Sequence, residues 1–567
     1  MATSIPTFKL KISEGMIDVD KSADRLFGYC IEASKGPVLD PIFVASNTEA
    51  KRIFGVDFAP HFFQKPTGLV ICRVGFEDMA KAQIVYQAYP MKNTGTEDEP
   101  VWEIDKTEAN KKDVLLISAT SEGASNHKVL ITKSLTGAGY NLSVTIEGVT
   151  AKNYQNLRNL TSVVKKINSK FGNYLEAKLV IDSEAKYNKE EEFNRATNQE
   201  PLSREQFVEL DGTNDGALTG GSNGVMLNTD GTKSTTLVTD ATNGLSKKTG
   251  LGTNGQFTNT ETNPETTLRA AYEKAFEKIQ EVDLLGIATL SGSRAVQNAL
   301  VEHINEVNDP EVAQLRFGIT GYLDYIEDPA NTSEQTSIEK LTAETEFINN
   351  EWIIYIGQGV IFEQDNKKQT LMPYEATQLY TGIRSALGYS EAIFGGEPKK
   401  VLNGVVDTLP VITDGSIIVK SDIEQLNEAG VCTFKKEYGE VTFVEGVTTI
   451  QDEDVLSYES MMSIVAHVTK RLIKIAKPYQ GQLLTEDLKS TLTTALSTEL
   501  KTITDTDGTL MALEDFNIPP YDVQVFSAAK TRFDEANQLI RESKIIIQVR
   551  IVPVGALRDI DLGVIVI

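Results

Sequence analysis

Both ends of the chain alternate hydrophobic and polar residues, which is the pattern of β-strands. Residues 544–552 (KIIIQVRIV) place four aliphatic side chains on one strand face and Gln548 and Arg550 on the other. Unpaired strands at free ends readily recruit other chains. We therefore interpret both ends as candidate arms that join copies of the protein by strand addition. The residues assigned to the arms are Phe8, Leu10, Ile12, Ile560, Leu562, Val564 and Val566.

The N-terminal part predicts an α/β segment followed by a β-rich module. Short apolar runs at residues 27–33, 41–44 and 68–74 indicate strands of a mixed α/β segment. From about residue 93 the pattern becomes mostly β, with short strands separated by Gly, Ser and Asn, which is typical of a β-sandwich or small barrel. The clearest of these strands are residues 114–117, 128–132 and 142–146.

Residues 211–260 contain ten glycines among Thr, Asn, Ser and Asp. A segment with so few apolar side chains buries too little apolar surface to offset the entropy cost of ordering it. The composition therefore predicts a long surface loop, with residues 228–262 as its polar part. Gly250, Gly252 and Gly255 have the spacing G-x-G-x-x-G, but no strand precedes them, as a dinucleotide site requires. We therefore expect no cofactor there.

A regular α/β region begins at Asn263 and Pro264, which predict the N-cap and first turn of a helix. Strand and helix patterns then alternate to about residue 450, and repeated βα units predict a doubly wound, mainly parallel sheet with helices on both faces. After about residue 455, two helices followed by strands predict an α+β domain. The predicted strands are 282–290, 316–323 and 352–362, and the predicted helices are 296–307, 338–347 and 374–387.

Composition narrows the class of protein. The 567 residues carry a formal net charge of −25, which disfavours phosphate-rich partners, so we expect neither nucleic acid nor membrane as a partner. No apolar run approaches the roughly 20 residues that span a bilayer. The N-terminus lacks a signal-peptide pattern, so we expect synthesis in the cytoplasm. Cys30, Cys72 and Cys432 are too few and too distant for a disulfide framework or a zinc site.

Catalytic and metal motifs are weak in this sequence. His303 and His467 fall within predicted helices, where a packed or solvated histidine is a simpler interpretation than a catalytic base. Four residues have the spacing of a calcium loop, but the aliphatic Ile503 occupies the first ligand position. We therefore expect no enzyme activity, no catalytic residue and no bound metal. The four loop residues are Asp505, Asp507, Gly508 and Glu514.

One basic feature is unusual in so acidic a chain. On the predicted helix from about Tyr458 to Lys477, the side opposite the apolar residues carries Lys470, Arg471, Lys474 and Lys477. Such a stripe can face an acidic partner. The alternative is a solvated face whose lysines interact favourably with the negative end of the helix.

Several short motifs occur in a recognisable order: residues 218–224 (LTGGSNG), 270–290 (AAYEKAFEKIQEVDLLGIATL), 404–406, 424–431 (EQLNEAGV) and 444–449 (VEGVTT). Together they resemble the tail sheath proteins of contractile-tailed bacteriophages and of related contractile injection systems. The resemblance covers most of the chain from about residue 205 onward, including the C-terminal part.

The resemblance implies a central domain with a subtilisin-like fold and no proteolytic role. It implies six-membered rings stacked helically around a tube, with terminal arms that add strands to neighbouring subunits. On this basis we expect an N-terminal arm (1–22), an α/β segment packing with the C-terminal region (23–92), a β-sandwich insertion (93–200), the subtilisin-like domain (201–450), an α+β C-terminal domain (451–553) and a C-terminal arm (554–567).

The same resemblance implies partners and a location. The partners would be further copies of the chain, the tail tube protein, and the baseplate and tail terminator proteins, in a virion tail assembled in the host cytoplasm. The basic stripe would then be the surface that faces the tube. The alternatives are a static surface or adhesin-like polymer and, less in keeping with the sequence, an α/β hydrolase. The terminal strands alternatively pair within their own domain.

Overall fold

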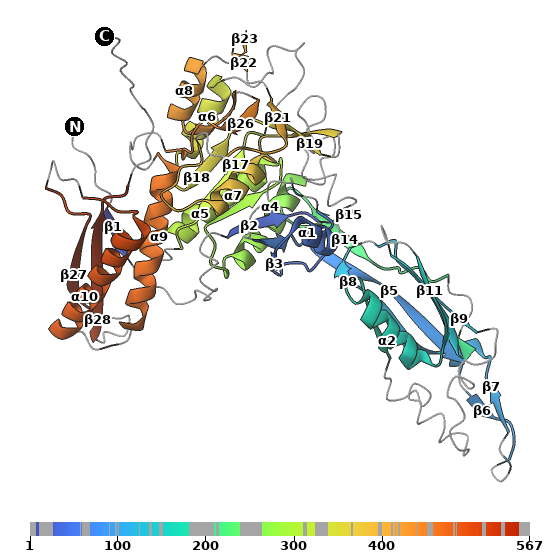
Figure 1. Cartoon of the computed structure of the whole chain (residues 1–567). Helices are drawn as coiled ribbons and strands as arrows, with labels where there is room; N and C mark the ends of the chain where they lie inside the picture. Colours follow the sequence, from blue (N-terminus) through green and yellow to red (C-terminus); the bar gives the residue numbers. More distant parts are fainter. Residues whose placement is uncertain are drawn as a thin grey trace.

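The computed structural model describes residues 7–10, 26–180, 209–238, 264–309, 314–323, 338–450 and 457–554, apart from short internal gaps. The chain has an α/β core, with the C-terminal helices and strands on one side and a β-rich insertion projecting from the other (Figure 1). Several predicted positions lie outside the described residues. They are Ile12, Gly250, Gly252, Gly255, Glu514, Ile560, Leu562, Val564 and Val566.

A seven-stranded sheet forms the centre of the core, in the order β24-β18-β17-β16-β2-β4-β3. All neighbouring strands are parallel except β3, which runs antiparallel to β4 at one edge. This confirms the predicted mainly parallel sheet. The strands are β2 (Phe27–Ile31), β3 (Ile42–Val44), β4 (Leu69–Arg73), β16 (Gly286–Thr289), β17 (Phe317–Gly321), β18 (Ile353–Ile356) and β24 (Val431–Cys432).

Helices cover both faces of this sheet. A Cβ atom on Gly28 of β2 would lie 2.5 Å from Ile279 of α4 (Pro264–Ile279), whereas the next residue, Tyr29, hydrogen-bonds Thr381 of α7 (Thr377–Ala386) at 2.7 Å. Because successive strand residues point to opposite faces, α4 and α7 lie on opposite sides of the sheet. The other core helices are α1 (Asn47–Phe54), α5 (Arg294–Asn308), α6 (Ile338–Ile348) and α8 (Lys420–Glu428).

The segment predicted as residues 23–92 contributes strands to the central sheet, and its packing with the C-terminal region stays a prediction. Its strands β2 and β4 lie inside the central sheet, where Phe27 of β2 pairs with Gly286 of β16. A hydrophobic pattern identifies a buried strand but does not say which distant strand it pairs with, and this pairing joins residues 27 and 286.

The predicted strand 352–362 is divided into two strands that belong to different sheets. β18 ends at Ile356, and β19 (Val360–Gln364) pairs with β20 (Lys367–Leu371) and β21 (Val405–Thr408). At the break, a Cβ atom on Gly357 would lie 2.3 Å from Val431, so only glycine allows this close approach. Two further hairpins are β22 (Ile412–Thr413) with β23 (Ser416–Ile417) and β25 (Phe434–Glu437) with β26 (Glu440–Phe443).

The β-rich insertion contains two sheets and a helix, so it differs from a plain sandwich. Helix α2 (Leu160–Phe171) begins at Asn159, whose side chain accepts a hydrogen bond from the backbone of Ser162, and it buries Val163, Ile167 and Phe171. The two sheets have the orders β12-β8-β5-β14-β15 and β11-β10-β9. The strands are β5 (Glu77–Tyr89), β8 (Lys112–Glu122), β9 (Lys128–Lys133), β10 (Tyr140–Thr145), β11 (Lys152–Leu157), β12 (Leu175–Leu179), β13 (Glu209–Leu210), β14 (Ser222–Leu227) and β15 (Lys233–Leu237), with a small hairpin of β6 (Met91–Asn93) and β7 (Trp102–Ile104).

Part of the predicted glycine-rich loop is a β-hairpin. Strand β14 pairs with β5 and with β15, so residues 222–237 extend the larger insertion sheet. Backbone pairing and the burial of Leu227 and Val238 order a segment that its polar composition alone assigned to a loop. The remainder of the predicted loop, residues 239–262, lies outside the described residues.

The C-terminal region consists of α9 (Glu459–Ala476), α10 (Glu486–Thr502) and a long hairpin, β27 (Tyr521–Phe533) and β28 (Leu539–Ile551). Buried residues of α9, α10 and β28 belong to the same continuous hydrophobic core as the central sheet. This region is therefore fixed to the α/β core through shared packing, as well as through the polar contacts described below.

Candidate assembly site

The terminal strands meet in one three-stranded sheet. β28 pairs with β27 along its whole length, and β1 (Thr7–Leu10) adds to the other side of β28, with Thr7 opposite Arg550 and Leu10 opposite Ile547. The predicted alternation is found in β28, where the aliphatic residues are buried or half-buried and Arg550 is exposed. In a single chain, the N-terminal strand thus lies on the chain's own C-terminal hairpin.

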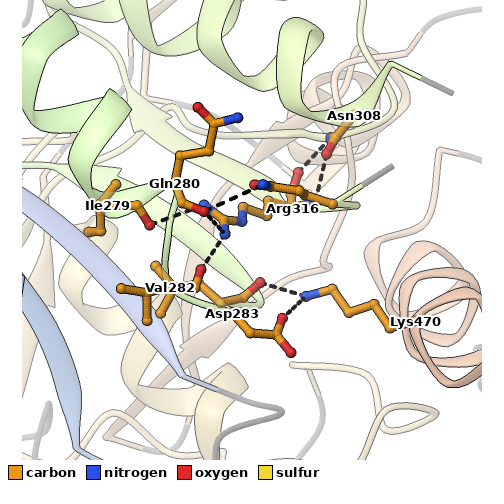
Figure 2. Close-up of polar contacts among 9 residues, drawn as sticks. Ile279, Gln280, Val282, Asp283, Asn308, Arg316 and Lys470 are labelled. Atoms are coloured by element: carbon orange, nitrogen blue, oxygen red, sulfur yellow. Dashed lines mark hydrogen bonds and ion pairs between the residues drawn. The ribbon is translucent and has the colours of Figure 1, made fainter. Parts of the chain in front are cut away.

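Helix α9 is held against the α/β core by Lys470. Its ammonium donates to the carboxylate of Asp283 at 3.0 Å and to the carbonyl of Leu284 at 2.7 Å, in the loop between α4 and β16 (Figure 2). Lys470 and Asp283 are both largely buried. The same loop is also held from the other side by Arg316.

Arg316 is a buried guanidinium that donates to three backbone carbonyls at the end of α4. The acceptors are the carbonyl oxygens of Ile279 at 3.3 Å, Gln280 at 2.9 Å and Val282 (Figure 2). Its own backbone is bound by the side chain of Asn308, which both donates and accepts at 2.7 Å. Carbonyls near a helix C-terminus lack intrahelical donors, and Arg316 adds donors to those already supplied by the Val282 backbone at Ile279 and the Gln314 side chain at Gln280.

The charges around this loop shift one another's ionisation. Burial acts to raise the pKa of Asp283, but the charges of Lys470, Lys474 and Arg316 together outweigh it, and the pKa of Asp283 is lowered. Burial lowers the pKa of Arg316 to about 10, which leaves it charged at neutral pH. The arrangement is a set of polar contacts that joins α9 and Arg316 to the segment between α4 and β16.

The predicted basic stripe is divided by the structure. Lys470 points to Asp283, and Arg471 pairs with Glu499 at 2.5 Å and Asp507 at 2.8 Å. Lys474 and Lys477 are exposed. Two of the four residues therefore hold the fold together, and contact with a tube stays a prediction for the two outer lysines.

Both helical histidines are packed side chains. His303 is buried against the ring of Phe276, with ring centroids 5.2 Å apart, and burial lowers its pKa to about 3. His467 stacks on Tyr389 at 3.9 Å, and its Nε2 lies 3.2 Å from Asp507. Neither ring lies beside a nucleophilic side chain in these contacts.

Asp507 of the loop with calcium-like spacing, and a serine motif at residues 220–224, both make contacts within the fold. Asp507 is bound by Arg471 and His467. The segment 220–224 (GGSNG) literally matches G-x-S-x-G, but Ser222 opens strand β14 and its hydroxyl accepts from the backbone of Gly224. A nucleophile elbow requires the serine on a strand-to-helix turn. In the part of the chain that the structure describes, no three His, Cys, Asp or Glu side chains are placed to hold a metal ion.

Sequence patterns did not reveal a buried ion pair between α7 and α9. Arg384 lies 3.4 Å from Glu459, and both are at most 1% exposed. Arg384 falls in a helix that is almost wholly buried, and Glu459 opens α9, where acidic residues commonly favour the helix N-terminus. A single charged residue within an otherwise uncharged helix is the signal that points to such a pair.

Comparison with known proteins identifies the fold. No protein-family model and no curated protein matches the chain. Among solved structures, a sheath tail protein from Desulfitobacterium hafniense matches with a TM-score of 0.52 and 11% identity, over 94% of this chain and 99% of that one. A sheath tail protein from Listeria innocua matches with a TM-score of 0.47 and 11% identity, over 93% and 96% of the two chains.

A contracted helical sheath of the anti-feeding prophage also matches, over 53% of this chain and 74% of that one, with 15% identity and a TM-score of 0.35. The match to the Desulfitobacterium protein covers almost all of both chains and shows that this chain has the fold of that sheath tail protein. No described helix is both long enough and apolar enough to cross a membrane.

Proposed function

We propose that the chain is the structural subunit of a contractile tail sheath. It polymerises as stacked six-membered rings around a tail tube, and contraction drives the tube through the host envelope. The observation that carries this proposal is the fold shared with a sheath tail protein over 94% of the chain. The tube, baseplate and tail terminator proteins are the partners, in a phage tail assembled in the host cytoplasm.

The core acts as a rigid body without catalytic work. In this proposal it is a subtilisin-like domain that has no proteolytic role. The packing of His303 and His467, neither of which lies beside a nucleophile, supports a non-enzymatic role. The continuous core that joins the central sheet with α9, α10 and β28 supports movement of the subunit as a whole.

In this proposal the arms are the links between subunits. Burying four aliphatic side chains of an arm yields ~6–12 kcal/mol, whereas fixing about eight backbone residues costs roughly 8–16 kcal/mol. One arm does not offset its own ordering cost, so it needs backbone pairing with a neighbour's sheet and the local concentration that a second arm supplies. The edge of β28 that pairs with β1 in a single chain is a strand-pairing edge, and in this proposal a strand from a neighbouring subunit takes that place in the sheath.

Negative-stain electron microscopy of the purified protein tests the proposal. We expect hollow tubes with helical striations, formed more readily when a tube protein is expressed together with the chain. Monodisperse particles at high protein concentration would contradict it. Flat sheets or filaments without a lumen would favour a static surface polymer instead.

A further inference from the structure

A segment of the insertion carries an excess of positive charge in a strongly acidic chain. Residues 151–180 contain six basic residues and one acidic residue, a net charge of +5, so the other 537 residues carry −30. Lys152, Arg158, Lys165 and Lys170 are exposed. Within the described part of the chain, no carboxylate oxygen lies within 4.0 Å of a side-chain nitrogen of these four residues, which is the distance that defines an ion pair.

These cations share one part of the insertion surface. Helix α2 lies against β11, because the ammonium of Lys166 sits 5.0 Å above the ring of Tyr154. Arg158 lies in the connection between the two elements, and Lys165 and Lys170 are exposed positions of α2. Together Lys152, Arg158, Lys165, Lys166 and Lys170 form what we call the basic face.

A region of matching size and opposite charge lies on the core. The helices α5 and α6 run side by side, because Arg294 pairs with Glu344 and the side chain of Asn350 donates to Asn305. Residues 294–309 and 338–351 together have 30 residues, seven of them acidic and two basic, a net charge of −5. The acidic residues are Glu302, Glu306, Asp309, Glu339, Glu344, Glu346 and Glu351.

An exposed aromatic residue lies within this acidic region. Phe347 is 80% exposed, and Glu346 and Glu339 are exposed on the same helix. Large apolar side chains surrounded by charged ones are typical anchors of interfaces. An aromatic ring also attracts lysine ammonium groups through its negative face. We call Glu306, Glu339, Glu346, Phe347 and Glu351 the acidic face.

We propose that the basic face of one copy docks against the acidic face of a second copy. Within one chain the insertion that carries α2 projects away from the core that carries α6, so the two faces meet only between copies (Figure 1). Their opposite charges of equal size favour this partner over a free anionic polymer. The inference names a contact between subunits and rests on the proposed function.

Charge reversal and its rescue test the docking. At low ionic strength we expect Lys165→Glu with Lys170→Glu to weaken self-association of the full-length protein about tenfold in sedimentation velocity. Adding Glu339→Lys with Glu346→Lys should restore most of the affinity. The matched control is Lys128→Glu with Lys133→Glu, which makes the same charge change at exposed lysines of β9 in the same insertion, and it should leave association unchanged.

Carbodiimide cross-linking gives a direct readout. This reagent joins an amine to a carboxylate in contact, and a mixture of ¹⁴N- and ¹⁵N-labelled protein distinguishes links between copies from links within one. Inter-copy links from Lys165 or Lys170 to Glu339 or Glu346 support the docking.

The outcomes separate this inference from the sheath function. Equal tube formation by the wild type and the reversed variant, without these links, overturns the docking and leaves the sheath function standing. Charge-dependent association with rescue, but no tubes, supports the docking and overturns the sheath function. Loss of association without rescue overturns the docking, as does binding of the basic face to a polyglycerol-phosphate polymer in place of a second copy.

Discussion

The guanidinium of Arg384 on α7 lies 3.4 Å from the carboxylate of Glu459 at the start of α9, and neither side chain is more than 1% exposed. Arg384 also donates to the carbonyl oxygens of Gly388 and Glu391, and Ser463 donates to Glu459. The pair therefore joins the α/β core to the C-terminal region in an environment where an unpaired charge is costly.

Removing one partner of this pair should destabilise the protein more than removing both. We expect Arg384→Met or Glu459→Gln to lower the free energy of unfolding by about 3–5 kcal/mol, because each leaves a buried charge unpaired. The double variant Arg384→Met with Glu459→Leu should lose much less. Urea denaturation at neutral pH measures the difference.

Arg269→Met is the control for that series, because it breaks an exposed ion pair with Glu302 and should change stability little. Equal losses from the single and double variants would show that Arg384 and Glu459 contribute through packing alone.

The contact between Lys470 and Asp283 should make part of the free energy of unfolding depend on pH in the acidic range. In the folded protein the pKa of Asp283 is lowered below its ordinary value of 3.8. The ionised Asp283 therefore stabilises the fold above pH 3.8, and this stabilisation is lost as the pH falls from 3.8 through the folded-state pKa. The stability difference between wild type and Asp283→Asn should therefore shrink as the pH is taken from about 6 to about 3. A difference that stays constant over this range in chemical denaturation would contradict the contact.

His303 predicts a second loss of stability on acidification, which begins at a higher pH than the loss expected from Asp283. Burial lowers its pKa from 6.5 to about 3, so the unfolded chain binds the proton first and stability falls as the pH drops below 6.5. Between about pH 7 and pH 5 the wild type should lose up to about 2 kcal/mol more than His303→Phe. The comparison uses denaturation curves at both pH values, with the difference at pH 8 as the baseline. Parallel curves for the two proteins would exclude a buried neutral histidine.

Local patterns predicted the elements whose hydrophobic spacing is regular. The helices around Val296 and Ile338 and the buried strands around Ile287 and Ile319 lie where the sequence placed them, because each buries one continuous face or is buried on both faces. The alternation in residues 545–551 likewise matches the burial along β28.

Long-range pairing and polar interiors were not predictable in this way. The pairing of β2 with β16 depends on a register between distant residues, and β14 is ordered by its pairing with β5. Lys470 was assigned to an outward stripe by its helical spacing, yet it finds Asp283 on another element. Spacing gives the face on which a charge lies, whereas the partner that meets that face comes from the tertiary fold.

The outer lysines of α9 provide a test of the tube contact. Lys474→Glu with Lys477→Glu should reduce sheath assembly on tubes severalfold, because both side chains are exposed. A small loss of thermal stability is expected as well, because the charge of Lys474 helps to lower the pKa of Asp283. Electron microscopy of the chain expressed together with a tube protein measures the assembled fraction. Lys128→Glu with Lys133→Glu controls for the change in net charge. Full assembly by the α9 variant would assign Lys474 and Lys477 to solvent.

Removal of the C-terminal arm should separate assembly from folding. Deleting residues 559–567 should abolish tube formation and leave the unfolding transition of the core unchanged, since the buried part of β28 ends at Ile551. A full-length variant keeps the length of the arm but removes its aliphatic side chains, and it tests whether these side chains carry the contact. Its substitutions are Ile560→Ser, Leu562→Ser, Val564→Ser and Val566→Ser. Mixing the truncated chain with the wild type should shorten the tubes, because each truncated copy lacks a strand for its neighbour. Intact tubes from the truncated protein alone would refute strand addition by this arm.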